Sequence, residues 1–128
     1  MPDITTRPDL EKLMEQFYRK AFADDLIGHY FTEVVKVNLE KHIPVIVDFW
    51  ESVLFDKGGY QGNVMQVHQH LHQLSAFRDE HFQRWVKVFK QTVDELFAGD
   101  ASEKLKQRAE SIAMVMRLKT VHGGIGKP

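Results

Sequence analysis

The chain has 128 residues, a formal net charge of −1 and no cysteine, and its isoelectric point is about 6.6. The lack of cysteine excludes disulfides, thiolate nucleophiles, cysteine-ligated zinc, iron–sulfur clusters and the thioether links of c-type haem. Acidic and basic residues are interspersed, which gives no basic field for nucleic acid or for an anionic membrane surface.

The length favours a single domain over residues 1–128 with a hydrophobic core of its own. The first residues, "MPDITTRPDLEK", are polar and acidic and do not have the pattern of a signal or transit peptide. The longest apolar run, around "IPVIVDFW", is too short to span a bilayer. We therefore expect a cytoplasmic globular protein, with residues 1–6 and 121–128 as frayed tails.

Apolar residues recur at helical spacing along the first part of the chain. From Leu10 to Phe22 they predict an amphipathic helix over residues 7–23, and "DDLIGHYF" predicts a short helical turn that ends at Phe31. A second helix is predicted to begin after Asn38 as its N-cap, and Pro44 should bend or restart it.

The helical pattern continues in the second half. The glycine-rich break "DKGGYQGN" is followed by a short helix over about residues 63–72. A wide apolar stripe from Phe82 to Phe97 predicts a long helix that ends at Gly99, and Ser102 is expected to cap the last helix. No segment alternates like a strand, so we predict an all-α fold.

Three histidines at alternate positions, in "VHQHLHQL", suggest a metal site. On a helix, His68 and His72 share one face while His70 lies on the other. Two ligands are too few for a closed zinc site, and the familiar protease, hydrolase, phosphate-binding, dinucleotide and di-iron motifs are absent. From spacing alone, solvated surface histidines are the simpler interpretation.

Aromatic residues are numerous, with nine Phe, three Tyr and two Trp. A small all-α chain can use them simply as core, which composition alone favours. The sharper hypothesis is a flat apolar cofactor, held between helices by one axial imidazole and a cage of large side chains. The residue pattern alone leaves both hypotheses open.

Four stretches resemble the truncated haemoglobin family, most closely its group III. They are "LMEQFYRKAF", "EKHIPVIVDFWESVLF", "GGYQGNVMQVHQHL" and "HFQRWVKVF", which follow in the family's order and cover nearly the whole chain. The resemblance implies a two-over-two helical sandwich that encloses haem. The run between His68 and Trp85 is a few residues longer than is usual in the group. His70 and His72 also lie close in sequence to the expected ligand. The choice of His68 therefore depends on the preceding "YQGN".

The resemblance also implies roles for particular residues. His68 would be the proximal iron ligand of a non-covalent haem b. Tyr18 and Trp85 would donate hydrogen bonds to bound dioxygen, and His42 would contact the ligand or gate the pocket. The plainer alternatives are a core tyrosine bonded to a carbonyl, a packing tryptophan, and a surface histidine beside Pro44.

Further pocket residues follow from the same resemblance. Phe31 would pack on the edge of the macrocycle, and Tyr60 and Arg78 would hold the propionates. The walls would be Val45, Ile46, Phe49, Leu71, Phe77, Phe82 and Met116. For these seven, plain core packing is the alternative.

Three functions follow from these patterns, with no catalytic residue assigned. The resemblance favours a haem protein that binds dioxygen, nitric oxide and carbon monoxide as a carrier or sensor. A second hypothesis is a haem enzyme for nitric oxide dioxygenation or peroxide chemistry, which would need an external reductase because the chain has no flavin domain. A third is a haem-free helical interaction or metal-clip protein.

Overall fold

The computed structural model describes residues 1–34, 36, 38–57 and 76–121. Every regular element in these ranges is a helix, which confirms the predicted all-α fold. The elements are α1 (Arg7–Ala23), the π-helix η1 (Tyr30–Val34), α2 (Leu39–Phe55), α4 (Asp79–Leu96) and α5 (Asp100–Thr120). The short helix predicted over residues 63–72 lies outside the described residues.

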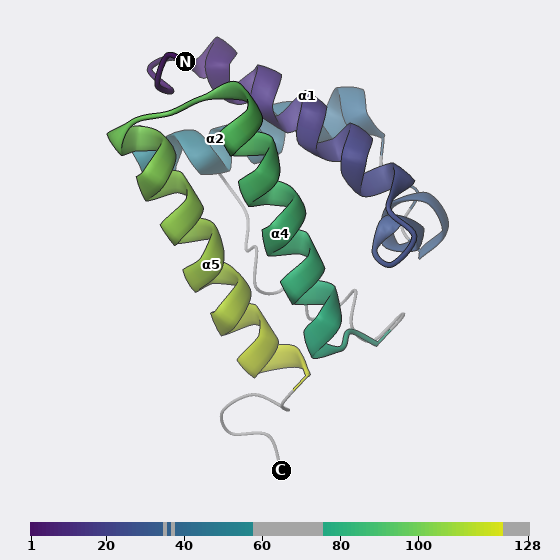
Figure 1. Ribbon diagram of the computed structural model, residues 1–128. Coiled ribbons are helices and arrows are strands. Elements are labelled where there is room, and N and C mark those ends of the chain that lie inside the picture. Colours follow the sequence, from purple (N-terminus) through teal and green to yellow (C-terminus); the bar gives the residue numbers. More distant parts are fainter. Residues whose placement is uncertain (35, 37, 58–75, 122–128) are drawn as a thin grey trace.

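The helices form two packed pairs (Figure 1). One pair is α1 with α2, and the other is α4 with α5, which run side by side. Contacts of α1 with α4 and of α2 with α5 join the pairs, which gives the predicted two-over-two arrangement. None of the described helices combines the length and hydropathy that crossing a membrane requires.

The first helix has the predicted bounds, and a capping box between Thr6 and Asp9 fixes its start. The Thr6 hydroxyl accepts from the Asp9 backbone N–H, while the Asp9 carboxylate accepts the backbone N–H of Thr6. This reciprocal capping satisfies donors that a helix start otherwise leaves unpaired. The inward face of α1 is apolar, and Tyr18 lies on it.

The segment between α1 and α2 differs from the prediction, and of the two predicted effects of Pro44 on α2, a bend or a restart, the restart does not occur. Instead of a short turn that ends at Phe31, a π-helix covers Tyr30–Val34. Asn38 caps α2 as predicted, but α2 runs through Pro44 without a restart. The carbonyl that would have accepted the missing proline N–H belongs to Glu40, whose exposure lets water take that place.

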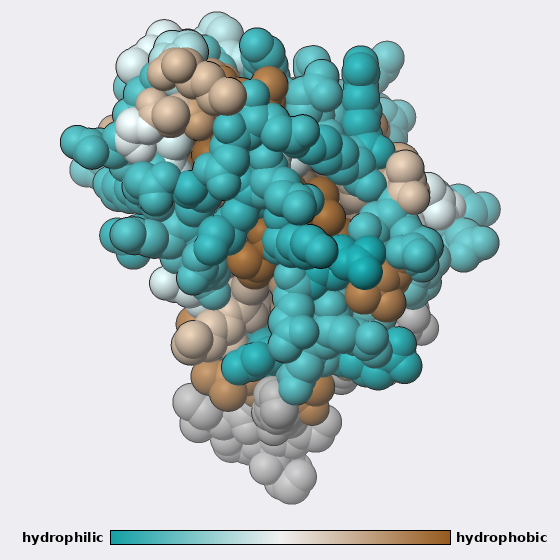
Figure 2. All heavy atoms as spheres, in the orientation of Figure 1, coloured by the Kyte–Doolittle hydropathy of each residue, from teal (hydrophilic) through white to brown (hydrophobic). Residues whose placement is uncertain are grey.

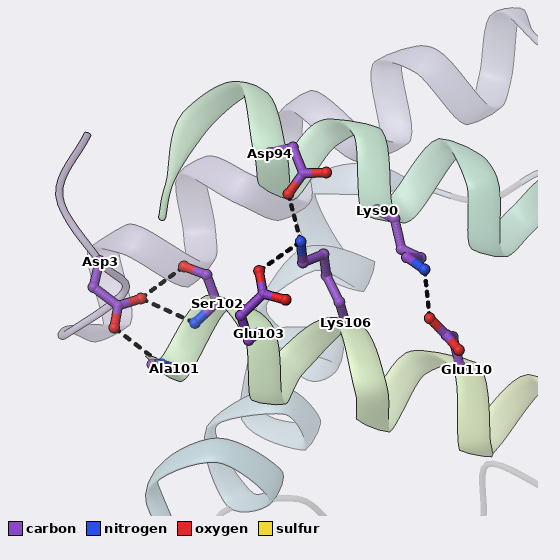
Figure 3. Close-up of polar contacts among 8 residues, drawn as sticks. All are labelled: Asp3, Lys90, Asp94, Ala101, Ser102, Glu103, Lys106 and Glu110. Atoms are coloured by element: carbon purple, nitrogen blue, oxygen red, sulfur yellow. Dashed lines mark hydrogen bonds and ion pairs between the residues drawn. The ribbon is translucent and has the colours of Figure 1, made fainter. Parts of the chain in front are cut away.

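The start of α5 contradicts two further predictions (Figure 3). Ser102 does not cap this helix, because it lies inside the first turn and Gly99 is the N-cap residue. Asp3 supplies the cap: its carboxylate oxygens accept the backbone N–H groups of Ala101 and Ser102 at 2.9 Å each, and the Ser102 hydroxyl at 2.6 Å. Ile4 is only 1% exposed. Residues 1–6 are therefore not a frayed tail.

Gly99 is required by this cap. Its φ is +143°, and a Cβ atom there would come within 2.5 Å of the Asp3 carboxylate. A larger residue would be strained and would also push away the group that caps α5.

Ion pairs fix α1 against both of its neighbours. The Arg7 guanidinium binds Asp48 at 2.7 Å and Glu51 at 3.1 Å, both on α2. At the other end of α1, the Arg84 guanidinium on α4 binds the Asp24 carboxylate at 2.9 Å. These contacts join α1 to the two helices against which it packs.

The buried side chains form two hydrophobic clusters. The main cluster contains Leu10, Leu13, Phe17, Tyr18, Val47, Trp50, Phe89, Val93 and Leu105, among others. The second cluster consists of Tyr30, Phe77, Phe82, Ala113 and Met116. Trp85 packs against both. Outside these clusters, the face seen in Figure 2 is largely hydrophilic, with apolar side chains showing between the polar ones.

Candidate functional site

A partly buried hydrogen bond joins two of the predicted distal residues. Tyr18 on α1 is 6% exposed, and its hydroxyl lies 2.9 Å from Nε2 of His42 on α2. The rings meet edge to face with centroids 5.0 Å apart. Burial raises the pKa of Tyr18, so the phenol keeps its proton. The phenol of Tyr18 can therefore accept from the imidazole of His42 and still donate its own proton elsewhere.

Aromatic rings surround this pair and fix the position of the Tyr18 ring. Phe17 packs edge to face on Tyr18 at 5.1 Å and on Trp85 at 5.9 Å between centroids. Phe31 also packs edge to face on Tyr18, with centroids 5.7 Å apart. Trp85 in turn stacks on Phe89 at 5.3 Å. The predicted donors Tyr18 and Trp85 thus share one aromatic neighbour, Phe17, from opposite helix pairs.

The predicted wall residues that the structure describes, together with Phe31, fall into two groups. Phe31, Ile46 and Phe49 are partly buried and pack against the main cluster. Phe77, Phe82 and Met116 belong to the second cluster. Val45 is 48% exposed, and it is the predicted wall residue that lies most in solvent among those the structure describes. Trp85 connects the two groups.

Four predicted residues remain, and Arg78 is the one among them that the structure describes. Tyr60, His68 and Leu71 lie outside the described residues, as do His70 and His72. Arg78 is exposed, and its guanidinium pairs with Glu80 at 2.7 Å. In the described ranges, no three His, Asp or Glu side chains gather in a way that could hold a metal ion.

The structure adds a polar pair that the sequence patterns did not single out. Tyr30 on η1 is 5% exposed and His81 on α4 is 7% exposed, and the Tyr30 hydroxyl lies 3.2 Å from His81 Nδ1. Burial, followed by the nearby charge of Arg78, lowers the pKa of His81. His81 lies in the first turn of α4, directly before the apolar stripe predicted from Phe82, where a side chain can reach back to the N-cap.

The two joined helix pairs match the predicted two-over-two sandwich of a truncated globin, and the predicted distal residues Tyr18 and His42 are hydrogen-bonded to each other. No family model matches the chain. The group 3 truncated hemoglobin ctb of Campylobacter jejuni is 30% identical over 114 residues, which are 87% of this chain and 87% of that one. The crystal structure of the group III truncated hemoglobin from Campylobacter jejuni matches with a TM-score of 0.85 and 26% identity, over 97% of this chain and 98% of that one. The chain belongs to the group III truncated haemoglobins.

Proposed function

We propose that the protein binds one haem b non-covalently and uses it to hold dioxygen and other diatomic gases. Membership of the group III truncated haemoglobins supports haem-based ligand binding. The sequence contains no cysteine, which supports a haem without thioether links. When bound, the haem iron would supply the position at which the gas binds.

The described side chains fit a flat apolar group. Phe31, Ile46, Phe49 and Trp85 pack on the core with one side and keep part of their apolar surface uncovered. Covering such surface contributes about 25 cal/mol per Å² removed from water, so a macrocycle lying against these side chains would be held largely by apolar contact. His68, which lies outside the described residues, would hold the haem iron through its imidazole.

The hydrogen bond between Tyr18 and His42 carries the distal part of the proposal. A buried phenol needs a polar partner, and this one has a half-buried imidazole beside it. When His42 donates from Nε2, the Tyr18 proton is left to point at a polar gas molecule. Trp85 offers a second donor, because its indole has an N–H and no acceptor.

Polarity then separates the gases. Dioxygen would carry partial negative charge when the protein holds it and would gain from the Tyr18 and Trp85 donors, while carbon monoxide is far less polar and would gain little. The site should therefore retain dioxygen selectively, as a carrier or a sensor would.

A visible absorption spectrum after haem is added to the purified protein tests the proposal. We expect a Soret band at one haem per chain, a shift of the band with carbon monoxide, and its removal by His68→Ala. The matched control is His72→Ala, which should leave the spectrum nearly intact. A missing Soret band in the wild type would reject the proposal, and loss of the band only in His72→Ala would move the ligand to His72.

A further inference from the structure

Tyr30 and His81 are buried side chains that the proposed function does not use, and their rings pack edge to face with centroids 5.2 Å apart. The Tyr30 hydroxyl donates to the carbonyl of Ala76 at 2.7 Å. The backbone N–H of Arg78 donates to His81 Nδ1 at 2.9 Å. Because Nδ1 accepts this bond, His81 is neutral and carries its proton on Nε2. The single hydroxyl proton of Tyr30 goes to Ala76, so each of the two side chains bonds to backbone at the entry of α4 and not to the other. We call these two residues the Tyr30–His81 latch.

The latch fixes the backbone on both sides of Phe77. Ala76 is held through its carbonyl and Arg78 through its N–H. Between them, the ring of Phe77 packs against Tyr30 at 4.7 Å and against Phe82 at 5.2 Å between centroids. The latch thus fixes the three residues before α4 at two backbone positions and by one buried ring.

The latch also reaches the distal side of the candidate site, because Tyr30 and Phe31 are consecutive residues of η1. Tyr30 contacts the entry to α4, while Phe31 packs on Tyr18 at 5.7 Å and stacks on Phe22 at 5.5 Å. The π-helix makes this possible, since its extra residue per turn redirects neighbouring side chains, and such turns are frequent at functional sites. The α4 entry and the distal phenol are therefore connected through one five-residue helix.

We infer that Tyr30 and His81 are positioning residues for the distal site. By holding η1 against the entry of α4, they keep Phe31 against the ring of Tyr18. The Tyr18 hydroxyl then stays directed at the place that the bound gas would occupy. This inference rests on the proposed function, because it concerns a donor that acts on a bound gas. It makes no claim that either residue touches that gas.

The test compares gas release from the haem-loaded protein with Tyr30→Phe, which removes the hydroxyl and keeps the ring. We expect dioxygen release to speed up about three- to ten-fold, because partial misalignment loses part of a charge-assisted hydrogen bond. Carbon monoxide release should stay within about two-fold, because that ligand gains little from the same donor. The double variant Tyr18→Phe/Tyr30→Phe should release dioxygen no faster than Tyr18→Phe alone, since the latch acts through Tyr18.

Variants of His81 separate positioning from general stability. His81→Asn keeps an acceptor near the place of Nδ1 and should retain wild-type dioxygen release, while His81→Leu should behave like Tyr30→Phe. Amide hydrogen exchange at Arg78 should accelerate in His81→Leu and not in His81→Asn. The control Thr92→Val also loses one buried hydroxyl bond on α4, to the carbonyl of Val88, and should leave the ratio of the two release rates unchanged.

The outcomes are distinguishable. A wild type that takes up no haem rejects the proposed function and this inference with it. A wild type that binds haem and gas, with Tyr30→Phe and His81→Leu releasing dioxygen at the wild-type rate, overturns the inference alone. Equal acceleration of both gases, or additive effects of the Tyr18 and Tyr30 changes, would also overturn it. Should Tyr30→Phe fail to fold, the two His81 variants decide.

Discussion

Replacing Tyr18 with phenylalanine removes one hydroxyl from the centre of the candidate site and leaves the packing almost unchanged. The ring would keep its edge-to-face contacts with Phe17 and Phe31. The polar loss is the 2.9 Å hydrogen bond to His42 and, in the haem-loaded protein, the donor to the gas.

Burial decides which of the two losses is larger. His42 is half-buried, so water can replace the phenol as its partner, and the stability cost should be at the low end of about 0.5–1.5 kcal/mol. Tyr18 is 6% exposed, so water is poorly placed to replace its hydroxyl next to the gas. A hydrogen bond to a charged acceptor contributes roughly 1.5–3 kcal/mol, which corresponds to about 10- to 150-fold in the dissociation rate.

Stopped-flow measurement of dioxygen and carbon monoxide release tests this reasoning. Tyr18→Phe should speed dioxygen release at least several-fold and change carbon monoxide release little. An equal response of both gases would mean that Tyr18 acts by shape alone. If neither gas responds, the hydroxyl points away from the ligand, and the distal donors are His42 or Trp85.

Three further predictions concern stability. Haem at about 1,000 times its dissociation constant should stabilise the fold by on the order of 4 kcal/mol, so equal melting of the apo and holo forms would count against an internal pocket. Asp3→Ala should lower the free energy of unfolding by about 1–2 kcal/mol, because the backbone N–H groups of Ala101 and Ser102 lose a charged cap; urea denaturation measures this, and an unchanged midpoint would refute it. Burial and then the charge of Arg78 lower the pKa of His81. As the pH falls, the imidazole of His81 is therefore protonated in the unfolded chain before it is protonated in the folded one. The stability from neutral His81 should be complete above about pH 6.5 and lost as pH falls below it. Denaturation at about pH 5 and about pH 7.5 should thus show a smaller drop in His81→Asn than in the wild type, and equal drops would exclude His81 as the source.

The helices could be predicted from the sequence because their signals are local. The bounds of α1 follow from a capping pair within four residues and an apolar face of regular period. The start of α2 at Asn38 follows from the same kind of signal. The π-helix was missed because its extra residue per turn follows no period of the sequence and depends on the packing of Tyr30 and Phe31 in two different clusters.

The candidate site was predictable only in part. The family resemblance selected Tyr18, His42 and Trp85, and the structure brings Tyr18 and His42 into direct contact. Helical periodicity alone could not predict this pairing, because it indicates only that a tyrosine is buried. Tyr18 and Tyr30 are both buried and cannot be told apart in this way. What distinguishes them is the partner that each hydroxyl meets, and those partners are 24 and 46 residues away in the chain.

The cap of α5 was also missed because the partner that forms it is distant in the sequence. Local rules chose Ser102, since a serine near a helix start commonly accepts a backbone N–H. In the structure the Ser102 hydroxyl donates to Asp3, and the Asp3 carboxylate accepts the helix N–H groups from 99 and 98 positions away. A carboxylate is a better acceptor than a hydroxyl at the positive end of a helix, so Asp3 takes the capping position because the fold places it there. Gly99 leaves room for the Asp3 carboxylate, so the need for glycine at this position is explained by a residue near the N-terminus.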